Sequence, residues 1–183
     1  MNPELVEKLF AIHEALKARS LPHAFGGAIA LAYCVQDPRG TRDLDVNVFV
    51  DAEKAAEVLS ALPEGVRVEE GDVEKVLRDG QTRLFWDGVP VDVFLNSLPL
   101  HEEVANKVLW VDLQGKQIPV LDCASLVIFK SFFSRTRDWG DIEEVALASP
   151  EDVDAALKAV SDLVGEDDPS YKRLAEIAAA NPS

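Results

Sequence analysis

Apolar residues recur along the chain with two different periods. In residues 5–16 they are spaced by three or four positions behind Asn2 and Pro3, which predicts an N-terminal helix that buries one face. In residues 43–50 they alternate with other residues, which predicts a strand with Asp43 and Asp45 on the face opposite the apolar one. The first 50 residues therefore already combine helical and extended structure.

Two later segments have the pattern of β-hairpins, in which two strand-like runs flank a short turn that contains glycine. The runs are residues 82–86 and 89–95 around Asp87-Gly88, and residues 108–113 and 116–121 around Gln114-Gly115. Beyond Asp122 the period becomes helical up to the C-terminus. The pattern predicts an α+β fold with a core of residues 1–122 and a helical C-terminal part, residues 123–183, packed on that core.

The composition narrows the class of protein. The chain of 183 residues is long enough for one core of ordinary size, and its 48% hydrophobic content excludes general disorder. Its formal net charge of −15 repels polyanions and argues against a protein that coats nucleic acid. Apolar runs fall short of the roughly 20 residues that span a bilayer, and the N-terminus differs from a signal peptide. We therefore expect a cytoplasmic protein with no membrane partner.

The two cysteines, Cys34 and Cys123, stand far apart in apolar surroundings. Neither belongs to a CxxC motif or to a Cys/His pattern with metal-ligand spacing. A disulfide framework and a structural zinc site are therefore both poorly supported. We expect two buried thiols.

Three aspartates are the candidates for metal chemistry. Asp43 and Asp45 share a face of their predicted strand, at a Cα separation of roughly 6.6 Å by strand rise, and two such carboxylates can converge on a hard divalent cation. Asp92 lies inside the apolar run of residues 91–95, and a buried lone aspartate is costly unless it is paired or metal-bound. If the two strands are neighbours, the three carboxylates surround a site for one or two Mg²⁺ ions. The alternatives are a solvated strand face for the first two, and hydrogen bonds from a neighbouring loop for Asp92.

A glycine pair precedes these acids. Gly26 and Gly27 stand between a short strand-like stretch and the helical residues 28–34. The bare backbone N–H groups of such a turn, together with the helix N-terminus, can approach a phosphate closely. An ordinary turn also explains the pair. The phosphate-binding interpretation is supported by the order of the elements, in which a helix, an Asp-x-Asp strand and a later Asp strand follow the glycine pair.

In this order the motifs resemble those of the nucleotidyltransferase superfamily related to DNA polymerase beta. The matching segments are Phe25-Gly26-Gly27, Arg42-Asp43-Leu44-Asp45-Val46 and Val91-Asp92-Val93. The stretch from Arg39 to Asp45, which includes Thr41 and Arg42, is similar to the abortive-infection, AbiEii-type toxin branch of that superfamily. So are Lys130 and the later Arg137-Asp138-Trp139-Gly140-Asp141. The resemblance covers about residues 23–145.

The resemblance implies a nucleotidyltransferase fold, in which a mixed β-sheet is flanked by helices and followed by a helical C-terminal part. It also implies Mg²⁺-dependent transfer of a nucleoside monophosphate from an NTP to an acceptor hydroxyl, with Mn²⁺ as an alternative metal. Asp43, Asp45 and Asp92 would bind the metal, and Asp92 would also take the proton of the acceptor hydroxyl. The nucleotide would contact Gly26, Gly27, Thr41, Arg42, Lys130 and Asp138. The acceptor would be a tRNA, a protein or a small molecule, and a role in a toxin-antitoxin system would add an antitoxin protein as partner.

Two departures from the family motif bear on activity. The spacer of 15 residues between Gly27 and Asp43 is longer than is usual in the family, and Gly27 replaces a serine whose hydroxyl commonly touches the phosphates. Three alternatives therefore stand beside the main hypothesis. They are a catalytically weak nucleotidyltransferase-fold binding module, an aminoglycoside-type small-molecule nucleotidyltransferase, and a glycosyltransferase that uses a sugar nucleotide.

Lys130 is the cation most open to interpretation. It lies in an apolar helical run, within a stretch between Asp122 and Asp138 that contains no acid. Its long side chain would either extend to solvent or reach a triphosphate as a point charge. Asp138 and Asp141 are one helical turn apart, which suits them to hold Lys130 or the base and sugar of a nucleotide.

Overall fold

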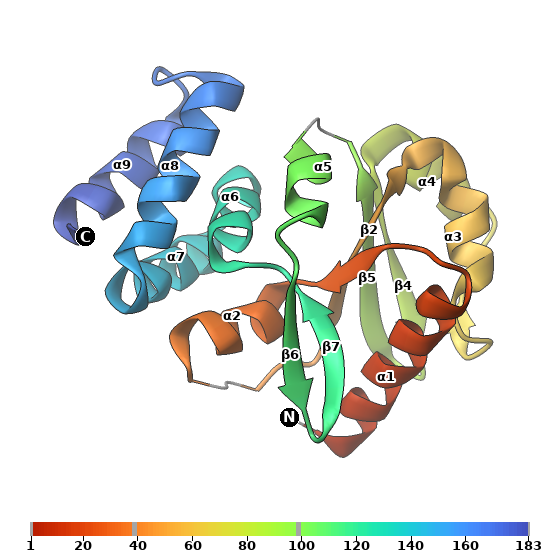
Figure 1. Ribbon diagram of the computed structural model, residues 1–183. Coiled ribbons are helices and arrows are strands. Elements are labelled where there is room, and N and C mark those ends of the chain that lie inside the picture. Colours follow the sequence, from red (N-terminus) through yellow and green to blue (C-terminus); the bar gives the residue numbers. More distant parts are fainter. Residues whose placement is uncertain (1, 38–39, 98–99, 183) are drawn as a thin grey trace. The chain divides into compact units, whose positions relative to one another are not determined.

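The computed structural model describes residues 2–37, 40–97 and 100–182, and the chain divides into two compact units (Figure 1). The first unit comprises Met1–Ile29 and Arg39–Leu121, and the second comprises Ala30–Pro38 and Asp122–Ser183. The second half of one helix, α2, therefore belongs with the C-terminal helices rather than with the sheet.

The first unit is built on a mixed sheet of seven strands in the order β3-β4-β5-β2-β1-β7-β6. The strands are β1 (His23–Phe25), β2 (Leu44–Asp51), β3 (Val66–Arg67), β4 (Gln81–Trp86), β5 (Val89–Asn96), β6 (Leu109–Leu113) and β7 (Lys116–Val120). The central strand β2 pairs in parallel with β5 and antiparallel with β1. The strand predicted for residues 43–50 is thus confirmed within one residue at each end, and it lies in the middle of the sheet.

Both predicted hairpins are confirmed. The turns Asp87-Gly88 and Gln114-Gly115 have positive φ at both residues, which is the conformation that a two-residue hairpin turn requires. Each turn fixes the register of the strands beside it, β4 with β5 and β6 with β7.

Helices α1 (Pro3–Ala18), α3 (Ala55–Ala61) and α4 (Asp72–Asp79) gather on one side of this sheet (Figure 1). The α1 helix begins as predicted, because the Asn2 side chain accepts a hydrogen bond from the Glu4 N–H and proline occupies the first turn. A short 3₁₀ turn (Ala52–Lys54) and α5 (Leu100–Ala105) complete the unit. The apolar stripes of β2, β4 and β5 are buried, and the opposite faces of β4 and β5 remain partly open.

The second unit is helical, as the period of the sequence predicts. It contains α6 (Cys123–Phe133), α7 (Thr136–Ala148), α8 (Pro150–Val164) and α9 (Pro169–Ala180), together with the second half of α2 (Gly27–Val35). Asp122 and Asp168 cap the N-termini of α6 and α9 by accepting hydrogen bonds from backbone N–H groups. Apolar side chains of these helices, such as Val153 and Leu174, form the core of the unit.

The expectation of two free thiols is wrong, because Cys34 and Cys123 form a disulfide. Their Cα atoms are 5.6 Å apart although 89 residues separate them in the sequence. The bond joins the end of α2 to the start of α6, within the second unit. Sequence spacing gave no sign of it, because only the packing of these two helices brings the cysteines together.

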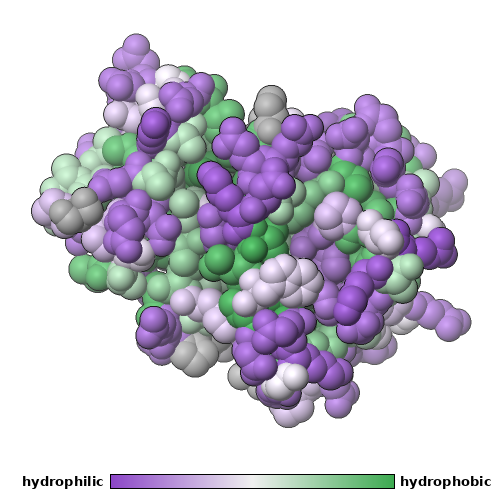
Figure 2. Space-filling view, viewed as in Figure 1, coloured by the Kyte–Doolittle hydropathy of each residue, from purple (hydrophilic) through white to green (hydrophobic). Residues whose placement is uncertain are grey.

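Hydrophilic residues cover most of the surface in Figure 2, as expected for a chain with a net charge of −15. Exposed large apolar side chains occur between them, among them Trp110 and Leu147. None of the helices formed by the described residues is both long and apolar enough to span a bilayer.

Candidate active site

The strand pairing places three charged side chains in a row across the sheet of the first unit. Asp45 on β2 lies directly opposite Asp92 on the parallel strand β5, and Asp92 lies directly opposite Arg83 on the antiparallel strand β4. Residues directly opposite each other on paired strands share a face of the sheet, so the three side chains project on the same side. Asp43 precedes β2 by one residue and stands two positions before Asp45. The structure therefore brings the three predicted acids into one region.

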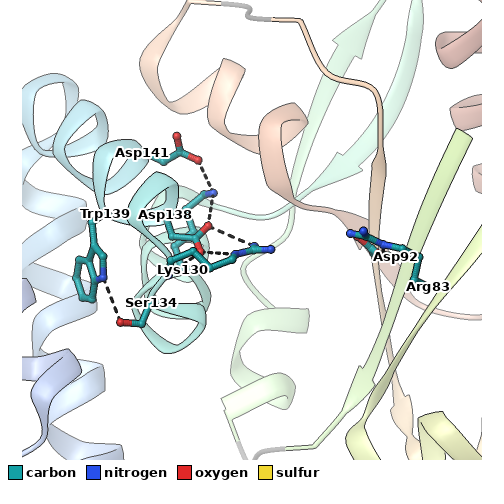
Figure 3. A network of polar contacts seen from close by, with 8 residues as sticks. Arg83, Asp92, Lys130, Ser134, Asp138, Trp139 and Asp141 are labelled. Atoms are coloured by element: carbon teal, nitrogen blue, oxygen red, sulfur yellow. Dashed lines mark hydrogen bonds and ion pairs between the residues drawn. The ribbon is translucent and has the colours of Figure 1, made fainter.

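Asp92 is less enclosed than its apolar run suggests. The β5 strand alternates, with Val91, Val93 and Leu95 buried on one face and Asp92 partly exposed on the other. Its carboxylate accepts two hydrogen bonds from the guanidinium of Arg83, each 2.7 Å long (Figure 3). The burial expected for Asp92 is thus only partial, because the strand has a partly open face, and its carboxylate is paired with Arg83 of the adjacent strand rather than with a neighbouring loop.

The glycine pair packs against Asp45. The Gly26 N–H donates a hydrogen bond of 2.9 Å to the backbone carbonyl of Asp45, and α2 begins at Gly27. Gly27 has a φ of +52°, and a Cβ at this position would overlap the Asp45 carboxylate, with 2.7 Å left to its Cγ. A serine at position 27, as in the family motif, would meet the same obstacle. Glycine is therefore required here by both backbone conformation and close approach.

Two further predicted residues lie just before β2. The Thr41 hydroxyl donates a hydrogen bond of 2.6 Å to the Asp43 carboxylate, which fixes that side chain relative to the loop. Arg42 is exposed, and this positively charged residue directly precedes Asp43 in the sequence. Gly26, Gly27, Thr41, Arg42 and the three acids thus all belong to the first unit.

Arg83 is the residue that the sequence analysis missed. Its pKa is raised above the ordinary value, mainly by the hydrogen bonds to Asp92 and by that carboxylate's charge, with smaller contributions from the charges of Asp43 and Asp45. A signal for it was present in the sequence. The two-residue turn Asp87-Gly88 fixes the hairpin register, and counting back from the turn places Arg83 opposite Asp92.

The acids fit a hard divalent cation by their chemistry, because carboxylate oxygens are the ligands that Mg²⁺ and Mn²⁺ prefer. Their present placement is not yet that of a metal site. Among the residues that the structure describes, no three His, Cys, Asp or Glu side chains are placed so that they could hold one ion together. Both oxygens of Asp92 are engaged by Arg83, so this carboxylate would have to leave that pair, or share it, to join Asp43 and Asp45 around a metal.

Lys130 and Asp138 belong to the second unit, where they share a buried network (Figure 3). The Lys130 ammonium donates hydrogen bonds to Asp141, at 2.6 Å, and to Asp138, at 3.4 Å. All three side chains are at most 9% exposed. The Lys130 side chain therefore does not extend to solvent. It lies near the end of α6 and pairs with two aspartates of α7.

Arg135 completes this network from outside. Its guanidinium donates a hydrogen bond of 2.7 Å to Asp138, whose carboxylate also accepts one from the Arg135 backbone N–H. Burial alone would raise the pKa of Asp138, but the hydrogen bonds from Arg135 and the charge of Lys130 hold that pKa below its ordinary value. The Asp-x-x-Asp spacing thus orients Lys130 through two carboxylates one helical turn apart.

Comparison with known proteins bears on the fold. No protein-family model and no curated protein sequence matches the chain. Solved structures do match it. A protein from Thermotoga maritima, provisionally assigned as a nucleotidyltransferase, is 17% identical, with a TM-score of 0.52 over 88% of this chain and 96% of its own.

Two further structures match over most of their length. The antibiotic-resistance factor ANT(2'')-Ia is 13% identical, with a TM-score of 0.56 over 98% of this chain and 92% of its own. An antigenic nucleotidyltransferase-like protein from Paracoccidioides brasiliensis is 14% identical, with a TM-score of 0.53 over 94% of each chain. The chain therefore has the fold of nucleotidyltransferases, as its motifs predict.

Proposed function

We propose that the protein is a nucleotidyltransferase that uses a divalent metal, Mg²⁺ or Mn²⁺, to move a nucleoside monophosphate from an NTP to an acceptor hydroxyl. The observation that carries the proposal is the position of Asp45. Its strand pairing places it beside Asp92, and Gly27 at the start of α2 lies against its carboxylate. Acids that bind a metal and a glycine turn that binds phosphate would then lie next to each other, which is what transfer of a nucleotide requires.

Each residue then has a role that follows from its surroundings. Asp43, which Thr41 orients, and Asp45 would hold the metal, with Asp92 as the third carboxylate. The bound metal would supply positive charge to the phosphates and to the leaving pyrophosphate. Asp92 would accept the proton of the acceptor hydroxyl. The hydroxyl oxygen would then bond to the α-phosphorus as the bond from that phosphorus to the pyrophosphate breaks.

The nucleotide contacts follow the same division. The Gly27 N–H would face the phosphates at the N-terminus of α2. Gly26, whose N–H is bonded to the Asp45 carbonyl, would contribute the lack of a side chain that lets a phosphate approach closely, and the exposed Arg42 would add a positive charge. Lys130 and Asp138 lie in the second unit, and their contact with the nucleotide stays a prediction from the resemblance of their motif. Because Asp141 and Asp138 both accept hydrogen bonds from the Lys130 ammonium, a triphosphate that binds Lys130 would have to compete with these carboxylates.

The decisive experiment measures pyrophosphate release from each NTP in the presence of Mg²⁺ or Mn²⁺. Asp45→Asn removes one ligand charge and keeps the side-chain volume, so turnover should be lost while the fold is retained. Asp51→Asn is the matched control, because Asp51 ends the same strand and is exposed. Equal release by both variants would remove Asp45 from the site. Metal-dependent NTP binding without release, in the native protein, would instead identify a binding module.

The acceptor is the open part of the proposal. The formal charge of −15 favours a cationic or neutral acceptor over a long nucleic acid, because a polyanion is repelled by most of the surface. A small-molecule acceptor is the second candidate function. ANT(2'')-Ia, solved in complex with adenylyl-2''-tobramycin, matches 98% of each chain with a TM-score of 0.51, but at 13% identity this likeness shows the fold alone.

A role as a toxin rests only on the AbiEii-like residues 39–45 and 130–141. Expression in a bacterial host tests it directly. Growth arrest that depends on Asp45 would support a toxin, and co-expression of neighbouring genes would then identify an antitoxin. Normal growth together with adenylation of an aminoglycoside by the purified protein would favour the small-molecule enzyme.

A further inference from the structure

We propose that Arg83 is a built-in counter-ion of the acidic site: it pairs with Asp92 in the metal-free protein and gives up this carboxylate when a divalent metal binds. The inference rests on the proposed function, because it takes the three aspartates as the metal-binding acids. It adds a positioning residue that controls how tightly the metal is held.

The geometry of the pair is specific. Arg83 Nε and Nη2 each donate a hydrogen bond of 2.7 Å to a different oxygen of Asp92, in the two-pronged arrangement that suits a guanidinium and a carboxylate. The hairpin register places the two residues directly opposite each other. Asp45 lies opposite Asp92 on the other neighbouring strand. The row across the sheet is therefore the positive Arg83 followed by the two aspartates, Asp92 and Asp45.

The charges explain why a cation belongs at this position. Three carboxylates in one region of a protein with a net charge of −15 repel one another, and a positive charge among them reduces this repulsion. The Arg83 guanidinium bonds Asp92 directly, and Asp92 lies beside Asp45 on the next strand. Arg83 thus compensates the acidic cluster when no metal is bound.

The exposure of the pair explains why it can open. The side chain of Arg83 is 54% exposed, whereas that of Asp92 is 14% exposed. An arginine this exposed can turn into solvent, and a bound metal would then supply the positive charge that the largely enclosed Asp92 carboxylate needs. Lys130, which pairs with Asp138 and Asp141, is by contrast only 9% exposed and lacks this freedom. Arg83 can therefore leave its carboxylate partner more easily than Lys130 can leave its two.

A direct prediction follows for metal affinity. Because a metal has to take Asp92 from Arg83, removing the guanidinium should strengthen metal binding. It should also weaken the metal-free protein, because the three carboxylates then lack their compensating charge. A residue with a purely structural role would weaken the fold with and without metal and would leave the affinity unchanged.

The test is a Mn²⁺ titration followed by the electron paramagnetic resonance signal of the free ion, with no nucleotide present. The native protein is compared with Arg83→Gln and with the control Arg78→Gln, which removes an equally charged side chain that pairs with Asp79 on α4. We expect Arg83→Gln to lower the Mn²⁺ dissociation constant by roughly three- to tenfold and the control to leave it unchanged. Thermal melts should show a lower Tm for metal-free Arg83→Gln and a larger rise in Tm on adding Mn²⁺.

Equal or weaker Mn²⁺ binding by Arg83→Gln would overturn the proposal, as would the lack of any Mn²⁺ binding by the native protein. If Arg83→Gln fails to fold, Arg83→Lys carries the test, because lysine keeps the charge but loses the two-pronged geometry and should give an intermediate tightening. Failure of the proposed function has a different signature. In that case Mn²⁺ affinity still responds to Arg83, but no NTP yields pyrophosphate.

Discussion

Gly27→Ala tests the closest contact in the candidate site. Gly27 begins α2 with a φ of +52°, and its missing Cβ leaves the space that the Asp45 carboxylate occupies. The substitution therefore has two costs: a backbone conformation that alanine adopts with difficulty, and an overlap that forces the Asp45 side chain to turn away. A single variant cannot separate these costs, but the chain offers a matched control.

Gly115 provides that control. It has a φ of +82° and lies in the hairpin turn between β6 and β7, where an added Cβ would meet nothing within 4 Å. Gly115→Ala should therefore show only the backbone cost, about 1–2 kcal/mol for a left-handed residue. Gly27→Ala should lose a further ~1–3 kcal/mol, the usual range for overpacking a filled site.

Urea unfolding followed by circular dichroism measures both losses, and Asp45→Ala completes a double-mutant cycle. With the carboxylate removed, the excess cost of Gly27→Ala over Gly115→Ala should fall to less than about 0.5 kcal/mol, as for two sites that no longer interact. Mn²⁺ binding should also weaken in Gly27→Ala and stay unchanged in Gly115→Ala. The reasoning is refuted if both glycine variants lose equal stability, or if the excess persists without the Asp45 carboxylate.

Three other predictions concern groups outside the acidic cluster. Lys130→Met should reduce the free energy of unfolding by ~3–5 kcal/mol, because it removes the cation that pairs with the buried Asp141 carboxylate, and adding Asp141→Asn should restore part of the loss in urea titrations. Burial lowers the pKa of His23 to about 4, although its bond to a backbone carbonyl opposes the shift. Between these pKa values the unfolded chain binds more protons than the folded one. The free energy of unfolding should therefore decrease as the pH is lowered from about 6.5 to about 4, and this pH dependence should be weaker in His23→Gln. Cys34→Ser should remove about 2–5 kcal/mol of stability, and dithiothreitol should lower the Tm of the native protein but not of this variant.

Local pattern was enough for the elements that bear the site. Alternation predicted β2, glycine-containing turns predicted both hairpins, and the change of period after Asp122 predicted the helical C-terminal part. These features depend on residues close in sequence, since strand and helix periods are properties of the local backbone. The resemblance of the ordered motifs to nucleotidyltransferases then predicted the fold that the solved structures share.

Besides the three aspartates, the sequence also contained information on the partner of Asp92. The register of the β4–β5 hairpin follows from its two-residue turn, so the pairing of Arg83 with Asp92 could have been counted out in advance. The partial exposure of Asp92 could not, because an apolar run does not tell whether a strand has one buried face or two.

Pairings between distant segments needed the tertiary structure. It decided that β2 and β5 are parallel neighbours with Asp45 beside Asp92, that Gly27 lies against Asp45, and that Lys130 is buried between two aspartates. It likewise joined Cys34 to Cys123 across 89 residues. The physical reason is the same in each case: hydrophobic burial selects an arrangement of whole elements, and the distance between two side chains on different elements exists only once that arrangement is formed.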